Sequence, residues 1–175
     1  HELLAIEMMC AFILMFPAEN EYDFFLKTQM LQTISDEQKH FKAYAAKMKQ
    51  AGIEFGDYPV SDFFWKYLSR INSQESFFAL MSLTFEAANL DFALFYKDLF
   101  EKVGDVEGAK ILEMVYLDEI NHVKSGVQVL KHQSPQADLW SYYQSLLPQG
   151  MTAARSKGII FDQASRLQAG LSQDF

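Results

Sequence analysis

The feature that most constrains the fold of this chain is a five-residue motif, Asp-Glu-x-x-His, that occurs twice. The two copies are residues 36–40 and residues 118–122. We expect both copies to lie in helices, where residues three positions apart share one face. Each copy therefore places a glutamate and a histidine side by side, and such a pair can reach one metal ion.

A further glutamate precedes each motif at nearly the same separation. Glu2 stands 35 residues before Glu37 (37 − 2), and Glu86 stands 33 residues before Glu119 (119 − 86). The six residues that begin with each of these glutamates align, Glu-Leu-Leu-Ala-Ile-Glu with Glu-Ala-Ala-Asn-Leu-Asp. The chain therefore contains two copies of one helical unit.

Helical geometry brings the members of each copy to one level. Gly104 marks a turn between two predicted helices. At a rise of about 1.5 Å per residue, Glu86 lies ~27 Å before this turn, and Glu119 and His122 lie ~22–27 Å after it. The first copy gives a similar result about a turn near residue 20. Each copy is thus a helix with one inward glutamate, a turn, and an antiparallel helix that carries Glu-x-x-His.

The two copies together supply six candidate metal ligands. These are Glu2, Glu37, His40, Glu86, Glu119 and His122. Four carboxylates in an apolar interior cannot stay ionised without partners, and two divalent cations would balance their charge. Carboxylate and imidazole ligands suit iron and manganese, and less distinctively zinc. We expect two metal ions, iron first, with manganese or a mixed pair as alternatives, in the ligand set of ferritin-like di-iron and di-manganese carboxylate proteins.

The predicted fold is all-α, a ferritin-like antiparallel four-helix bundle with an additional C-terminal helix. We expect residues 1–175 to form a single domain, because strand alternation is nowhere convincing and glycine and proline are few. Asp23, Ser73 and Asp105 are the expected caps of three helices. The expected bundle helices span about 1–16, 23–50, 73–103 and 105–131, with a short helix at 63–71, the extra helix at 135–147, and an irregular tail at 149–175 with one short helix at 162–168.

Composition limits the partners and the compartment. Half of the 175 residues are hydrophobic, which is enough for a large core. The formal net charge of −8 gives no global basic footprint for nucleic acid. The single Cys10 allows no intrachain disulfide and no cysteine-based metal site. The longest apolar run, residues 8–16, is too short to span a bilayer, so we expect a cytoplasmic protein without a membrane segment.

Four further acidic residues are candidates for supporting roles. Glu7 is a rival of Glu2 as the ligand from the first helix, although the internal alignment pairs it with Asp91. For Glu7 and Asp91, the alternatives are a hydrogen bond to a metal ligand or a contact with the chain ends. Asp36 and Asp118 could each accept the free imidazole N–H of the opposite histidine, or serve only solubility.

One aromatic residue is a candidate for redox chemistry. Tyr116 lies one helical turn before Glu119 and is either a redox-active phenol or part of the core. We assign no metal role to His1, at the start of the chain, or to His132, near the end of its helix, where a cation suits the helix dipole.

The motif segments resemble an uncharacterised bacterial family of ferritin-like proteins, known as a domain of unknown function and related to the tRNA-hydroxylating ferritin-like enzymes. The similar segments are His1–Glu7, Asp36–Phe41, Gly52–Tyr58, Phe85–Asp91, Asp118–Val123 and Lys157–Gly170. The resemblance covers nearly the whole chain and implies a dinuclear site on the same six residues. It does not supply a reaction, because the activity of that family is not established.

Three functions follow as hypotheses. The first is an oxidoreductase in which two metal ions activate O₂ or peroxide to oxidise or hydroxylate a small molecule or a modified nucleobase. It would need an external electron donor, because the chain has no Gly-x-Gly-x-x-Gly fingerprint. The second is an iron-handling protein of ferroxidase or storage type, and the third is a scaffold that keeps metals for stability.

The proposed functions differ in the oligomeric state and the surface that they require. We expect a monomer or a small homo-oligomer for an enzyme, and a large shell for a storage protein. Docking of tRNA would need a basic surface, and the candidates for one are Lys39, Lys42, Lys47 and Lys49. The acidic balance of the chain argues against this mode.

Overall fold

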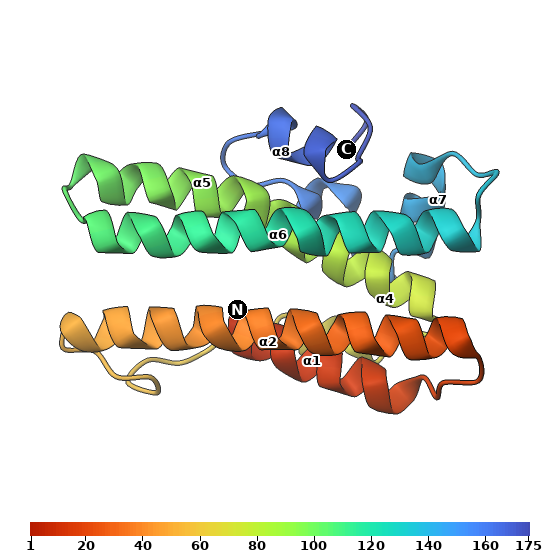
Figure 1. Ribbon diagram of the computed structural model, residues 1–175, viewed down its shortest axis with the longest axis horizontal. Helices are drawn as coiled ribbons and strands as arrows, with labels where there is room; N and C mark the ends of the chain where they lie inside the picture. The colour runs from red at the N-terminus through yellow and green to blue at the C-terminus, as the bar shows by residue number, and fades with distance from the viewer. The chain divides into compact units, whose positions relative to one another are not determined.

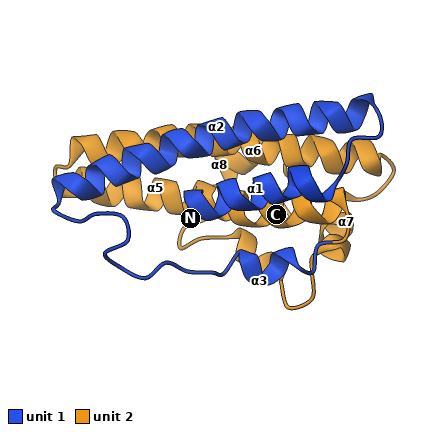
Figure 2. Cartoon of the chain, turned by 90° about the horizontal axis from the view of Figure 1, so that it is seen from below, with its two compact units in different colours: residues 1–71 blue, residues 72–175 orange.

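The computed structural model describes all residues from 1 to 175, and its regular structure is entirely helical. This confirms the all-α prediction. The helices fall into two compact units, residues 1–71 and residues 72–175 (Figures 1 and 2). Each unit is built around an antiparallel pair of long helices, so that the internal repeat in the sequence corresponds to a repeat in local structure.

The first unit consists of α1 (Glu2–Met15), α2 (Glu21–Gln50) and the short α3 (Trp65–Leu68). Helix α1 packs along α2 and also contacts α3. Phe16, which precedes Pro17, is extended, with φ −113° and ψ 97°, and ends α1 as expected for a residue before proline. The short helix predicted at 63–71 is present, but as α3 it has only four residues.

The start of α2 differs from the prediction. Asn20, not Asp23, is the N-cap, and its side chain accepts a hydrogen bond from the Asp23 backbone N–H at 3.0 Å. The Asp23 carboxylate in turn accepts the Glu19 backbone N–H at 3.0 Å. Both side chains are good cap acceptors, and this reciprocal pair moves the helix start upstream to Glu21.

The second unit begins with one continuous helix from Gln74 to Lys102 that contains a π-helical segment. It comprises α4 (Gln74–Leu80), the π segment η1 (Met81–Glu86) and α5 (Ala87–Lys102). The predicted helix over about 73–103 is confirmed at both ends. The π-helical segment in its middle was not predicted. Ser73 caps the helix as predicted, and Gly104, at φ +78°, turns the chain.

Helix α6 (Val106–Gln133) runs back along α5 (Figure 1). Asp105 caps it as predicted and accepts the Gly108 backbone N–H at 2.9 Å. The long helix 74–102 meets the length and composition of a membrane span, but 78% of its apolar window is buried inside the protein. That burial is typical of the core helix of a soluble protein.

The C-terminal part adds α7 (Leu139–Leu146), the 3₁₀ turn η2 (Ala153–Ser156) and α8 (Gln163–Gln168) to the second unit. Helix α7 starts later than the predicted residue 135, because Asp138 is its N-cap and accepts the Ser141 backbone N–H at 2.9 Å. The predicted short helix in the tail is confirmed as α8. Helix α7 packs on α4 and α6, and α8 packs on α5 and α6.

Candidate metal centre

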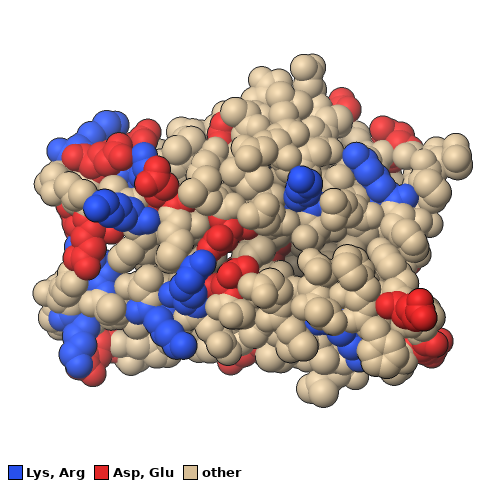
Figure 3. All heavy atoms as spheres, viewed as in Figure 1, with Lys and Arg blue, Asp and Glu red and all other residues tan.

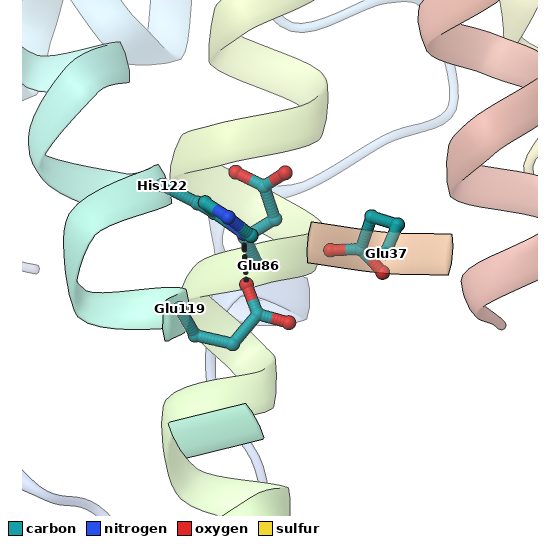
Figure 4. A group of neighbouring side chains, drawn as sticks. All are labelled: Glu37, Glu86, Glu119 and His122. Atoms are coloured by element: carbon teal, nitrogen blue, oxygen red, sulfur yellow. Dashed lines mark hydrogen bonds and ion pairs between the residues drawn. The ribbon is translucent and has the colours of Figure 1, made fainter. Parts of the chain in front are cut away.

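Three of the predicted ligands meet in the second unit. Glu86 is the last residue of η1, and Glu119 and His122 lie on α6. Each offers one ligand atom, and these atoms lie within 4.8 Å of one another. Figure 4 shows the three side chains beside one another, with a dashed line between Glu119 and His122. Glu119 Oε2 lies 3.3 Å from His122 Nδ1. The group could hold a metal ion, and its members are only 3–5% exposed.

The hairpin of α5 and α6 explains this meeting. The turn at Gly104 reverses the chain, and α6 then runs back along α5, η1 and α4. Residues at equal rise from the turn reach the same level, as the sequence predicted for Glu86, Glu119 and His122. The i, i+3 spacing places Glu119 and His122 on one face of α6, and Glu119 contacts Asn89 of α5.

The π segment and a glycine on α6 set where Glu86 lies. A π turn holds an extra residue and widens the helix, and such turns occur frequently at functional sites. Gly126 of α6 packs directly against this segment, because a Cβ at Gly126 would lie 2.3 Å from Ser82 Cβ. Thr84 Oγ1 donates to the Ala79 carbonyl at 2.8 Å and lies 2.9 Å from the Tyr143 hydroxyl, which ties the segment to α7.

Sequence reasoning missed one residue that contacts a candidate ligand. Asn89 Nδ2 donates a hydrogen bond of 2.7 Å to Glu119 Oε1. Asn89 lies three positions after Glu86 and so faces α6 beside it. That spacing is a signal that could have identified it, because an amide on a ligand-bearing face is well placed to orient a ligand on the neighbouring helix.

The first unit carries the second Glu-x-x-His pair. Glu37 and His40 lie on α2 and are 2% and 0% exposed. His40 Nδ1 lies 3.6 Å from Glu37 Oε2, close to the 3.3 Å between the same atoms of His122 and Glu119. The two copies of the motif therefore have a similar Glu–His separation.

Glu2 is the most exposed of the six predicted ligands. It is the first residue of α1, and its side chain is 13% exposed. Its carboxylate lies 3.2 Å from the amino group of His1. The rival Glu7, one to two turns further along α1, accepts a hydrogen bond of 2.8 Å from the indole Nε1–H of Trp65. Glu7 thus links α1 to α3.

The acidic residues that precede the ligand glutamates are half-buried. Asp36 forms an ion pair with Lys39 at 3.8 Å on the surface of α2. Asp118 lies at the corresponding position of α6 and is also half-buried. The proposed bond from each to the opposite histidine stays a prediction.

Asp91 joins helix α5 to the C-terminal segment. It is fully buried and pairs with Arg166 of α8, with Arg166 Nη2 2.9 Å from Asp91 Oδ2. Its two oxygens also accept the backbone N–H groups of Gly158 and Asp162, each at 2.8 Å. Of the two roles considered for Asp91, the structure shows the contact with the C-terminal segment.

Tyr116 is held by the same C-terminal segment. Its hydroxyl donates a hydrogen bond of 2.6 Å to Asp162 Oδ2. Burial and this hydrogen bond raise the pKa of Tyr116 to about 12. The phenol therefore stays protonated at neutral pH and donates its hydrogen bond to the Asp162 carboxylate.

The comparisons with known proteins give a family without an activity. No curated protein and no solved structure matches the chain at a significant level. One family model matches, and the match spans residues 1–175, which is the whole chain. The chain therefore belongs to the family described as "Protein of unknown function (DUF455)".

Proposed function

We propose that this protein is a dinuclear metal carboxylate oxidoreductase that activates O₂ or peroxide to oxidise or hydroxylate a small substrate. In this proposal the two units combine as a ferritin-like four-helix bundle. The pair Glu37 and His40 then faces the group of Glu86, Glu119 and His122, with Glu2 as the sixth ligand. The observation that carries the proposal is the buried group in the second unit, whose Glu–His geometry recurs in the first.

The chemistry of the side chains fits two metal ions. Five of the six proposed ligands are at most 5% exposed, so their carboxylates are largely removed from water. Buried charges need partners or metal ions. Oxygen and imidazole nitrogen ligands suit iron and manganese, whereas zinc would bind without redox activity. Iron is our first choice, followed by manganese or a mixed pair.

The residues of the chain would each have a defined task. When bound, two reduced metal ions would supply electrons to O₂ or peroxide. The four glutamates and two histidines hold the ions, and Asn89 orients Glu119 through its 2.7 Å hydrogen bond. Apolar residues near Glu86, including Leu83 and Leu90, are fully buried and would keep water from the reacting atoms.

The partners in this proposal are small molecules and a reductant. Electrons must come from an external donor, because the chain has no dinucleotide fingerprint. Nucleic acid is not part of the proposal, because the net charge is −8 and the face in Figure 3 mixes basic side chains with acidic ones. We propose a cytoplasmic monomer or small homo-oligomer.

Metal loading and oxygen uptake test the proposal together. Apo protein is loaded with Fe(II) without oxygen, the ions per chain are counted by mass spectrometry, and oxygen uptake is then followed with an electrode. We expect two ions per chain and oxygen consumption that Glu119→Ala abolishes. His132→Ala is the matched control, because His132 is exposed on the same helix. One ion or none per chain, or no oxygen uptake by the diferrous protein, would overturn the proposal.

A further inference from the structure

We propose that Asn89 makes the two metal positions unequal, so that the position with Glu86, Glu119 and His122 binds its ion first and more tightly. The inference rests on the proposed function, because it concerns the order in which that dinuclear site fills. It follows from one hydrogen bond that is present in the second unit and from the residue that takes the same place in the first.

The hydrogen bond is short and reaches a buried carboxylate. Asn89 Nδ2 lies 2.7 Å from Glu119 Oε1, at the short end of the usual range for N–H···O bonds. Glu119 is only 3% exposed, so little water competes for this oxygen. The bond therefore holds the end of a side chain that would otherwise rotate about several single bonds.

The orientation that results brings an oxygen of one ligand next to the nitrogen of another. With Oε1 bonded to Asn89, the other oxygen of Glu119 lies beside His122, 3.3 Å from Nδ1. Glu86 lies one turn before Asn89 on the same face of the helix. The packing of α5 on α6 thus fixes the positions of Glu86, Asn89 and Glu119 before any ion binds. A site arranged in advance loses less entropy on binding.

The first copy lacks this amide. In the alignment of the two repeats, the residue equivalent to Asn89 is Ala5 of α1, whose methyl group cannot donate a hydrogen bond. Ala5 is buried at 7% exposure, as expected for a residue that faces α2. The two copies share their ligand types and differ at this orienting position. In this proposal, that difference makes the position with Glu37 and His40 the second to fill.

Stepwise metal titration tests the inference. Apo protein is titrated with Co(II) without oxygen, and the two dissociation constants are obtained by calorimetry with the visible absorption of Co(II) as a second readout. We expect two resolved steps, the tighter lost in His122→Ala and the weaker lost in His40→Ala. Asn89→Ala should weaken the tighter step by roughly 10–100-fold, the usual effect of removing an orienting partner of a ligand.

Matched variants separate orientation from packing. Asn89→Leu keeps the side-chain volume but has no donor, so it should weaken the tighter step as much as Asn89→Ala does. Asn121→Ala removes an exposed amide from between the two ligands on α6 and should leave both constants unchanged. Circular dichroism checks that each variant keeps its helices.

The outcomes distinguish the two claims. Fewer than two Co(II) ions bound by the wild-type protein would overturn the proposed dinuclear site itself. Two ions with equal constants, or unchanged constants in both Asn89 variants, would overturn the role of Asn89 and leave the dinuclear site standing. Loss of both steps to the same extent in Asn89→Leu would also contradict the inference, because it requires a local effect.

Discussion

Arg166 and Asp91 form a fully buried ion pair that fastens the C-terminal segment to α5, with 2.9 Å between Nη2 and Oδ2. Arg166 also donates to the carbonyl oxygens of Ala87 at 3.1 Å and Ser156 at 2.7 Å. One guanidinium thus joins α5, η2 and α8.

Removal of this guanidinium should destabilise the protein strongly. Arg166→Met leaves Asp91 buried without its cation, which typically costs about 3–5 kcal/mol of unfolding free energy. For a chain of this size, the melting temperature should fall by roughly 6–20 °C. Thermal unfolding followed by circular dichroism measures this fall. Lys66→Met, which breaks an exposed pair with Asp62, is the control and should not change the melting temperature measurably.

Asp162 should stabilise the fold only above acidic pH. Burial opposes its ionisation, but hydrogen bonds from Tyr116, Ser165 and backbone groups outweigh this and lower the pKa of Asp162. A lowered folded-state pKa gives stability that is complete above the unfolded value of about 3.9 and is lost as pH falls through the folded value. Asp162→Asn keeps a good helix cap but cannot ionise. Its deficit in melting temperature should be full at pH 6 and should shrink below about pH 4.

Tyr116 should show the opposite dependence. Its folded-state pKa of about 12 lies above the ordinary value of about 10, so its contribution is complete below pH 10 and is lost at higher pH. Tyr116→Phe should therefore lower the melting temperature equally at pH 7 and pH 9, and an ultraviolet titration should lose one late-ionising phenol. Loss of oxygen consumption with two ions still bound would assign Tyr116 the redox role instead.

Gly126 should be required for the close packing of α6 on the π segment. In Gly126→Ala the new methyl group meets Ser82 Cβ at 2.3 Å and Leu83 Cδ1 at 2.7 Å, so a backbone must move. The higher helix propensity of alanine is worth at most about 1 kcal/mol and offsets only part of the strain. We expect a net loss of about 1–2 kcal/mol in chemical denaturation. Lys124→Ala, exposed on the same helix, should be neutral; a neutral Gly126→Ala would contradict this packing.

Local signals in the sequence were enough to predict most of the helices and to place the candidate ligands on one face of each helix. Ser73 and Asp105 precede helices whose ends follow from glycine and from periodicity, and Glu119 and His122 share a face because of their spacing alone. These features depend on neighbours within a few positions along the chain, which is why periodicity and capping rules find them.

The remaining features depend on contacts between distant segments. The π segment packs against Gly126, where no side chain stands between the two helices. The ion pair of Asp91 with Arg166 joins residues 75 positions apart. The choice of Asn20 over Asp23 as the cap was also beyond sequence reasoning, because both side chains can accept the same kind of hydrogen bond. The spacing of Asn89 from Glu86 places it on the ligand-bearing face, but its partner Glu119 is set by the packing of two helices.

Anomalous scattering from crystals of protein purified without added metal tests the central claim most directly. Data collected on both sides of the iron, manganese and zinc absorption edges give the number, position and identity of bound ions. The account predicts two peaks per chain, one among Glu86, Glu119 and His122 and one at Glu37 and His40, with an iron or manganese edge. Crystals that show no peak at these residues even after soaking in Fe(II), or a single ion, would contradict it.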